Sequence, residues 1–488
     1  EIASCLVGSE MCIRDRSTTM HFMPGCEILQ SFDLVHWEHA TYVYETLDHT
    51  DAQQLKSGQN IYGQGMWAAS LRYHEGRFYI CFVANDTRKT YLYTSEKIDG
   101  PWKKQLIEGF YHDGSLLFDE DGRNYIVYGN DEIWITELNE DLTAPKKDGL
   151  HRLLVSDHKN PELGYEGSHI QKINGYYYIF LIHSLRDRWM RTEACFYSDS
   201  LEGEFTGGDV LCDDRGYCGQ GVAQGGIVDT PDGKWYAMLF QDSGAVGRLP
   251  ILLPVTWKDH FPVFGQNGHV PEEIEVHSTR PGYIYQPLVG SDDFCNGLLP
   301  RWQFNHDPDP RYYHLDALQG TYTITTREVC TELTQAVNTL TQRMSYPSCA
   351  AEVTVDASAL KEGDVAGLCA FQGCYAAVGI TKHHGKYEVL MLDKKEDGIL
   401  DMTEGTVVES HQMDFRLEAD FCNMKDEARC YYRVNKGDWL PIGTVHKLYF
   451  KLDHFTGCRF GLFCYAAEEK GGSACFRDFK YYDVDEIS

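Results

Sequence analysis

The chain lacks three features that would each have indicated a particular class of protein. It has no uninterrupted apolar run of about 18 residues, which excludes a membrane-spanning helix. None of its 17 cysteines forms a C-x-x-C pair, which argues against a structural zinc site. Positive charge is also scarce, with 44 Lys and Arg against 73 Asp and Glu. A net charge of -29 argues against nucleic acid, whose phosphates require clustered basic residues.

The remaining composition describes a globular protein with more than one domain. A chain of 488 residues is too long for one ordinary core, so we expect two domains. An odd number of irregularly spaced cysteines favours free thiols in a reducing, cytoplasmic compartment, with secretion left open. Aromatic residues reach 13%, which suits a sugar-binding cleft but equally a protein rich in β-strands.

The first sixteen residues do not read as part of a fold. Residues 1–16 (EIASCLVGSEMCIRDR) have neither the basic start nor the apolar centre of a signal peptide. The string CLVGSEMCIRDR looks like the translation of a sequencing adapter. We therefore expect this segment to be artefactual, the genuine chain to begin near Ser17, and its true start, with any signal peptide, to be missing.

A repeated hairpin organises the next 250 or so residues. Each copy is a short strand, a two-residue turn ending in Gly, and an aromatic-rich strand. The copies are WAASLRYHEGRFYICFV from Trp67, DGSLLFDEDGRNYIVYG from Asp113, EGSHIQKINGYYYIFLI from Glu166 and QGGIVDTPDGKWYAMLF from Gln224. The turn glycines, Gly76, Gly122, Gly175 and Gly233, lie 46, 53 and 58 residues apart, the length of a four-stranded propeller blade.

The register of the repeat predicts a site. Trp67, Asp113, Glu166 and Gln224 each lie nine positions before a turn glycine. Equivalent positions on the innermost strands of a propeller converge at one end of the central axis. Solvated rim carboxylates are the ordinary alternative for one Asp or Glu, but the shared register and the Gly after both carboxyl residues favour a site.

The complete fold prediction is all-β. Four hairpins imply four blades, and residues from Ser17 to about Tyr44 indicate the outer strands of a fifth, incomplete first blade. We place the five-bladed propeller at 17–285. Beyond it, alternating stretches such as AAEVTVDAS and HKLYFKLDH predict an antiparallel β-sandwich of the jelly-roll type at 286–488.

These phrases resemble glycoside hydrolase family 43, the β-xylosidases and α-L-arabinofuranosidases. The resemblance runs from MPGCEILQSFDLVHW through HDGSLLFDEDGRNYIVYG, YEGSHIQKINGYYYIF and VGRLPILLPVTWKDHFPVFG into LPRWQFNHDPDPRYY. It covers nearly all of the chain after residue 16. It implies hydrolysis of terminal xylose or arabinose from xylan-type oligosaccharides by an inverting mechanism, with a concanavalin-like sandwich behind the catalytic domain.

The resemblance also implies roles for individual residues. The general acid falls on Glu166, and the Asp that orients it and modulates its pKa falls on Asp113. Trp67 matches the aromatic floor of the sugar subsite, and Arg248 matches an arginine that reaches towards the substrate. Gln224 stands where many relatives carry a His that helps to hold a central ion or water, which puts a calcium ion there in doubt.

The general base is the residue that the chain is missing. The family carries it as an Asp in a D-P motif on the first inner strand, where this sequence has none. An inverting glycosidase needs that carboxylate to activate water opposite the acid, so we expect the chain as written to be impaired. No cofactor is required. A calcium ion among Asp292, Asp293 and Asp478 of the sandwich is a weaker alternative to solvated strand ends.

Three functional classes stay open at this point. The first is the pentose-releasing hydrolase, whose partner is a pentose-containing oligosaccharide. The second is a non-catalytic sugar-binding propeller, favoured only by the missing base. The third is a protein-interaction propeller, which gives no reason for carboxyl groups in matching axial register. The sequence does not choose between xylose and arabinose and does not indicate an oligomeric state.

Overall fold

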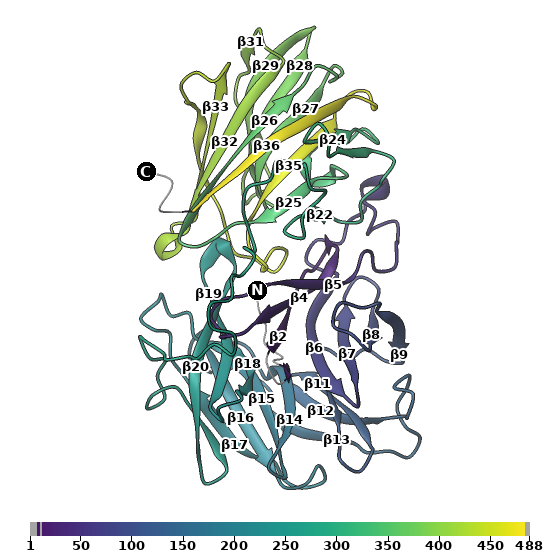
Figure 1. Cartoon of the computed structure of the whole chain (residues 1–488), viewed down its shortest axis with the longest axis vertical. Coiled ribbons are helices and arrows are strands. Elements are labelled where there is room, and N and C mark those ends of the chain that lie inside the picture. The colour runs from purple at the N-terminus through teal and green to yellow at the C-terminus, as the bar shows by residue number, and fades with distance from the viewer. Residues whose placement is uncertain (1–6, 10–11, 484–488) are drawn as a thin grey trace.

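The computed structural model describes residues 7–9 and 12–483 and confirms an all-β protein with a propeller and a sandwich (Figure 1). The propeller consists of five antiparallel four-stranded sheets, or blades. Blade 1 contains β1 (Val7–Ser9), β2 (Cys12–Ser17), β4 (Gly25–Ser31) and β5 (Glu38–Tyr44); blade 2, β6 (Met66–His74), β7 (Arg77–Ala84), β8 (Lys89–Ser95) and β9 (Lys103–Ile107); blade 3, β10 (Ser115–Phe118), β11 (Asn124–Asn130), β12 (Glu132–Leu138) and β13 (His151–Ser156); blade 4, β14 (Glu166–Ile173), β15 (Tyr176–Ser184), β16 (Arg191–Ser198) and β17 (Thr206–Leu211); blade 5, β18 (Ala223–Asp229), β19 (Trp235–Asp242), β20 (Arg248–Lys258) and β21 (Phe261–Phe264).

Blade 1 differs from the incomplete blade that the sequence predicted. Strand β2 pairs with β4 along Ile13–Ser17, and the short strand β1 pairs with β2. The blade therefore has four strands, because residues of the segment that we set aside take up the inner positions. The artefactual origin of residues 1–16 stays a prediction, and residues 1–6 and 10–11 lie outside the described part of the chain.

The predicted two-residue turns form in two of the four hairpins. Glu75-Gly76 and Asn174-Gly175 connect directly paired strand ends, and all four residues have positive φ. The other two turns are wrong as predicted, because the chain leaves the ladder earlier and forms five-residue loops over 119–123 and 230–234. There only Gly122 and Gly233 take positive φ, as expected of longer loops around a type I turn.

The sandwich packs a nine-stranded sheet against a seven-stranded one. The first sheet contains β3 (Phe22–Met23), β22 (Gln303–Asn305), β25 (Leu340–Arg343), β27 (Asp364–Phe371), β28 (Ala376–His383), β29 (Lys386–Lys394), β30 (Leu400–Met402), β31 (Thr406–Val408) and β35 (Arg459–Ala466); the second contains β23 (Tyr313–Asp316), β24 (Thr321–Thr325), β26 (Ser348–Asp356), β32 (Gln412–Asp420), β33 (Glu427–Val434), β34 (Leu440–Lys447) and β36 (Ser473–Asp483). Alternate residues of β32, including Phe415 and Leu417, are buried between the sheets, which is the period expected of a strand with one core face.

Helical structure is confined to single turns. They are η1 (Lys56–Gly58), η2 (Gly244–Val246), η3 (Leu333–Gln335) and η4 (Cys422–Met424). Among the described residues, no helix is both long and apolar enough to cross a membrane. The predicted domain boundary at 285/286 falls in the irregular segment between β21 and β22.

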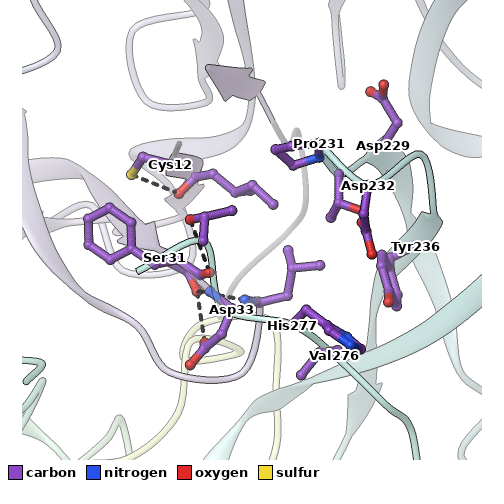
Figure 2. Close-up of a pocket in the computed structure, with 14 residues that line it drawn as sticks. Cys12, Ser31, Asp33, Asp229, Pro231, Asp232, Tyr236, Val276 and His277 are labelled. Atoms are coloured by element: carbon purple, nitrogen blue, oxygen red, sulfur yellow. Dashed lines mark hydrogen bonds between the residues drawn. The ribbon is translucent and has the colours of Figure 1, made fainter. Parts of the chain in front are cut away.

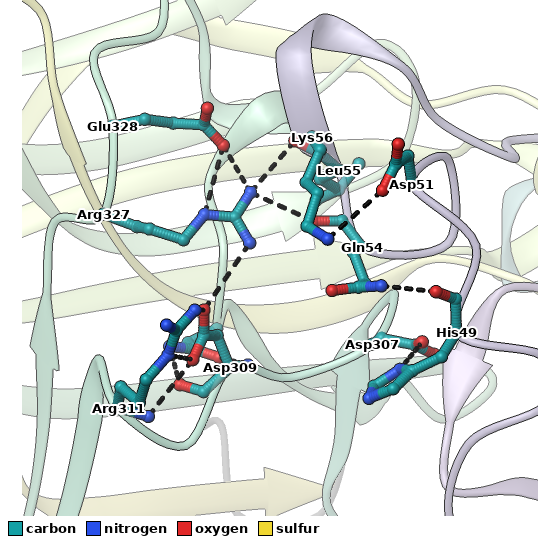
Figure 3. Close-up of polar contacts among 11 residues, drawn as sticks. His49, Asp51, Gln54, Leu55, Lys56, Asp307, Asp309, Arg311, Arg327 and Glu328 are labelled. Carbon is teal, nitrogen blue, oxygen red and sulfur yellow. Dashed lines mark hydrogen bonds and ion pairs between the residues drawn. The ribbon is translucent and has the colours of Figure 1, made fainter.

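The two domains are joined by shared structure as well as by that segment. Strand β3, which lies between two strands of blade 1, pairs with β22 of the sandwich. Figure 3 shows a polar seam nearby, where Arg327 of the sandwich donates to the carbonyl oxygens of Gln54 and Leu55 in the propeller. At the same seam His49 Nδ1 lies 2.5 Å from Asp307 Oδ2.

Three histidines are buried where the domains meet. The His21 ring from the propeller lies 4.9 Å from the His306 ring and 5.3 Å from the His454 ring, both from the sandwich, with Tyr62 beside them. His306 Nε2 accepts the Ile61 N–H, whereas neither ring nitrogen of His21 has a hydrogen-bond partner among the described residues. Burial lowers the pKa of His306 to about 3 and lowers the pKa of His21 well below its ordinary value of 6.5.

We expect the interface to lose stability in acid. A histidine whose pKa is lowered on folding binds its proton only in the unfolded chain, so its contribution is complete above pH 6.5 and is lost as the pH falls from there towards the folded pKa. Replacing His21 by Phe should flatten the dependence of the unfolding free energy on pH between 6 and 4 by about 1.4 kcal/mol per pH unit. Urea unfolding at several pH values measures this. The partly exposed His74, replaced by Phe, is the control, and equal slopes for His21→Phe and the parent would contradict the expectation.

Candidate active site

The four residues in repeat register lie at the inner strand starts, as predicted. Trp67, Glu166 and Gln224 are the first or second residues of β6, β14 and β18, and Asp113 precedes β10 by two. In blades 2, 4 and 5 the strand pairing is interrupted just after this position. Such bulges re-aim a side chain out of the regular alternation, and here they occur where the strands approach the axis.

A hydrogen bond between neighbouring blades joins the two carboxyl residues. Gly167 N donates to Asp113 Oδ2 at 3.0 Å, and Ser168 Oγ donates to the Asp113 carbonyl oxygen at 2.7 Å. Both Asp113 and Gly167 have positive φ. The residue directly after Glu166 is thus fixed to Asp113, which sets the position of the Glu166 side chain relative to that carboxylate.

Glu166 has two further polar neighbours that the sequence did not identify. Asn130, the last residue of β11, donates from Nδ2 to Glu166 Oε2 at 2.8 Å. His112 places Nε2 3.9 Å from the same oxygen and 3.7 Å from Asp113 Oδ2. His112 could have been noticed as the residue before Asp113, and Asn130 as the residue directly after the quoted repeat segment, but neither is in repeat register.

Two groups of the cluster have raised pKa values. Burial, reinforced by the Glu166 carboxyl, raises the pKa of Asp113, although His112 and the Gly167 N–H act against this. The Asp113 carboxylate and then Glu166 raise the pKa of His112 to about 9, despite its partial burial. Perturbed pKa values of this kind are characteristic of sites that carry out acid–base chemistry.

Gln224 is fixed by an acid of its own. Its backbone N donates at 2.7 Å to Glu193 Oε2, a fully buried carboxyl group whose pKa burial raises well above its ordinary value. Gln224 has positive φ, and its side chain packs directly against the Cα of Gly167. Gln224 therefore supports the Glu166 segment from blade 5.

The sandwich supplies one wall of the site. The Phe455 ring meets the Trp67 ring edge-on at 5.5 Å, and the Arg248 guanidinium lies 4.5 Å from the Phe455 ring centre. Trp67 also lies 6.1 Å from the His112 ring. The predicted substrate-binding pair Trp67 and Arg248 is therefore brought together around a residue of the second domain.

The orientation of Arg248 depends on a buried carboxylate. Its Nε lies 3.1 Å from Asp242 Oδ1, and Arg191 Nε lies 2.9 Å from Asp242 Oδ2. The Phe240 ring packs under both guanidinium groups. Planar cations held in this way lose little freedom when they bind a substrate hydroxyl.

The backbone before Arg248 is docked into the sandwich. Cys458 N donates to the Ala245 carbonyl oxygen at 2.8 Å, and Gln372 Nε2 approaches the same oxygen. Gly247 and Gly457 approach so closely that a Cβ on Gly247 would lie 2.8 Å from Gly457 N. The sandwich therefore both closes one side of the site and positions Arg248.

The sequence predicts that the general base is missing from this chain. Its place in the family is the innermost strand of blade 1, and the side chains of that strand lie outside the described part of the structure. The Asp-Pro pairs that the chain does contain begin at Asp307 and Asp309. They lie in the interdomain seam, where Asp307 pairs with His49 and Asp309 with Arg311 (Figure 3). Neither carboxylate belongs to the axial cluster.

A separate hollow of about 290 Å³ opens where blade 1 meets blade 5 (Figure 2). It is lined by residues that include Asp33, Asp229 and Asp232 but by none of the predicted site residues. Asp33 already accepts hydrogen bonds from the backbone of Val35 and His36. The hollow is therefore distinct from the axial site.

Metal binding has two candidate locations. His112, Asp113 and Glu166 offer ligand-type atoms within 4.8 Å of one another. A metal ligand must be a neutral imidazole, whereas His112 is protonated at neutral pH, so this trio favours proton transfer. In the sandwich both oxygens of Asp292 already accept hydrogen bonds, from Phe294 N and Trp302 Nε1. Calcium among Asp292, Asp293 and Asp478 stays an untested prediction.

Comparison with known proteins agrees with this geometry. Residues 14–262 match the model of glycosyl hydrolases family 43, and residues 291–482 match the β-xylosidase C-terminal concanavalin A-like domain. A β-xylosidase of Formosa agariphila is 25% identical over 96% of this chain and 85% of that protein. A non-reducing-end α-L-arabinofuranosidase of Bacteroides ovatus is 23% identical over 82% of this chain and 77% of its own. A solved bifunctional GH43-CE protein of Bacteroides eggerthii is 40% identical with a TM-score of 0.91, covering 99% of this chain, which spans 62% of that protein's length.

The fold is a propeller with two carboxyl residues at one end of its axis. An aromatic side chain and the sandwich domain border these residues. Together these features define the class of β-propeller glycoside hydrolases. The family match covers more than half of the chain and includes strands of every blade. The chain belongs to glycosyl hydrolases family 43, with the C-terminal domain of its β-xylosidases.

The contact between Gly167 and Gln224 gives a stability prediction. In Gly167→Ala the new Cβ would lie 2.6 Å from Gln224 Nε2, at a residue with φ of +65°. We expect a loss of about 1 kcal/mol from the backbone conformation and a further loss of about 1–3 kcal/mol from the clash, measured by urea unfolding. Gly175→Ala is the matched control, because φ is +84° there and nothing lies within 4 Å. In the double variant Gly167→Ala/Gln224→Ala, the stability lost to the clash should be recovered. Equal losses in Gly167→Ala and Gly175→Ala would contradict the contact between Gly167 and Gln224.

Proposed function

We propose that this protein removes terminal xylosyl or arabinofuranosyl residues from xylan-type oligosaccharides, with Glu166 as the general acid. The observation that carries the proposal is the placement of Glu166 beside Asp113 and His112, next to the wall formed by Trp67, Arg248 and Phe455. The relatives named β-xylosidase and α-L-arabinofuranosidase support the choice of pentose substrates.

The chemistry follows from the roles of these groups. Glu166 donates its proton to the glycosidic oxygen as the bond between that oxygen and the anomeric carbon breaks. Asp113, hydrogen-bonded to Gly167, holds the acid in position and disfavours its early ionisation. In an inverting enzyme, a second carboxylate activates water on the opposite face of the sugar. In the family that base is an Asp-Pro residue on the first inner strand, where this sequence has none.

The wall formed by the sandwich supports attack at chain ends. Phe455 packs against both Trp67 and Arg248, so the site is closed on that side by a residue fixed to another domain. A pocket closed on one side accepts a terminal sugar more readily than the middle of a polymer. We therefore propose an exo-acting enzyme and leave the choice between xylose and arabinose to assay.

Replacement of Glu166 by Gln tests the assignment. Hydrolysis of 4-nitrophenyl β-D-xylopyranoside, 4-nitrophenyl α-L-arabinofuranoside and the corresponding unactivated oligosaccharides is measured for both proteins, each with the N-terminal residues that carry the general base restored. We expect Glu166→Gln to lose about 10²–10⁴-fold on the oligosaccharides and much less on the 4-nitrophenyl glycosides, whose leaving group needs little protonation. The exposed Glu162, replaced by Gln, is the control. Unchanged turnover of oligosaccharides by Glu166→Gln would refute the role.

A further inference from the structure

His112 faces both carboxyl groups of the proposed acid site. Its Nε2 lies 3.7 Å from Asp113 Oδ2 and 3.9 Å from Glu166 Oε2, and its ring lies 6.1 Å from the ring of Trp67. The side chain is 22% exposed, so it is neither sealed in the core nor free in solvent. An imidazole in this position can act on the charge of both acids at once.

The surrounding charges make His112 a cation at neutral pH. Asp113 is the largest influence and, with Glu166, raises the pKa of His112 to about 9, against the opposing effects of burial and of Arg88. Arg88 is stacked on Phe110, and Arg248, which acts on Asp113, is already paired with Asp242. His112 is therefore the cation that lies against both Asp113 and Glu166.

We propose that the His112 imidazolium is a positioning residue that balances the charge formed when Glu166 gives up its proton. The inference rests on the proposed function. In the acid-competent form that the proposed function requires, Glu166 carries its proton, and the charges of an Asp113 carboxylate and the His112 imidazolium cancel. When the C–O bond breaks, its electron pair goes to the leaving oxygen, which takes the proton of Glu166. The three side chains together then carry one negative charge, whereas without the imidazolium they would carry two. His112 keeps its own proton.

This role differs from simple packing in its consequences. A cation that stabilises the Glu166 carboxylate makes Glu166 a stronger acid, so its loss slows proton donation while letting the protonated form survive to higher pH. A side chain that only fills space would change the rate without moving the pH profile upwards. A fall in the rate together with a move of the alkaline limb to higher pH is therefore expected only if His112 acts through its charge.

The kinetic experiment compares His112→Gln, which keeps a hydrogen-bond donor but no charge, with the parent protein. For aryl glycosides with poor leaving groups we expect kcat to fall by about tenfold or more, with little change for activated ones. The alkaline limb of the kcat/KM profile should move to higher pH. His74→Gln is the control, since His74 stacks on Phe118 at the opposite end of blade 2. An unmoved or lowered alkaline limb, or an equal loss for all leaving groups, would overturn the proposal.

A titration that needs no turnover tests the same charge. The ring signals of His112 are identified in the full chain by their loss in His112→Gln, and their midpoint is followed by ¹⁵N-resolved NMR. We expect His112 to remain protonated well above pH 7, and Asp113→Asn to bring its midpoint down towards 6.5. A His112 that is neutral at pH 7 overturns the inference even in an active enzyme. Failure of the proposed function would show separately, as undiminished oligosaccharide hydrolysis by Glu166→Gln.

Discussion

The hydrogen bond from Gly167 N to Asp113 Oδ2 links blade 3 to blade 4 at the end of the propeller axis. A propeller repeats one blade around that axis, so the innermost strands must approach one another closely at a single place. Close approach leaves no room for regular side chains, which accounts for the positive φ of Asp113, Gly167 and Gln224 and for the interrupted pairing that follows in blades 4 and 5. These backbone conformations also bring the Glu166 side chain next to Asp113. The proximity of the two carboxyl groups therefore follows from the close packing of the inner strands around the propeller axis.

A second constraint comes from the sandwich. The turn η2 is docked by Cys458 N on the Ala245 carbonyl, and Phe455 lies a few residues earlier on the same sandwich loop. Arg248 begins β20 directly after the docked turn. The position of Arg248 and the wall of the pocket therefore depend on one interface, and a disturbance there would reach substrate contacts without touching the carboxyl groups. Burial lowers the pKa of His21 and of His306 where the two domains meet, so the stability of the interface also depends on pH.

The sequence was sufficient for the number of blades and for the register of their inner strands. Blade spacing and the nine-residue offset placed Trp67, Asp113, Glu166 and Gln224 at the axis, because a repeated hairpin carries its register with it. It failed where neighbours come from outside the repeat. Phe455 lies 191 residues beyond Phe264, where the last blade ends, and reaches the site only through docking. The loops at 119–123 and 230–234 were misread because an Asp-Gly pair fits both a two-residue turn and a longer one, and the choice depends on where the ladder ends.

The overall charge of the protein and the local contacts both act on the proton affinity of the site, and their relative weight can be judged. A net charge of -29 produces a negative field that raises proton affinity everywhere. At about 0.1 M salt, however, exposed charges are screened beyond roughly 10 Å. The contacts of His112 with Asp113 and Glu166 are shorter than 4 Å and largely buried, so salt weakens them much less. The acidity of the site is therefore set by a few neighbours at the axis, and the acidic surface can vary without altering the chemistry.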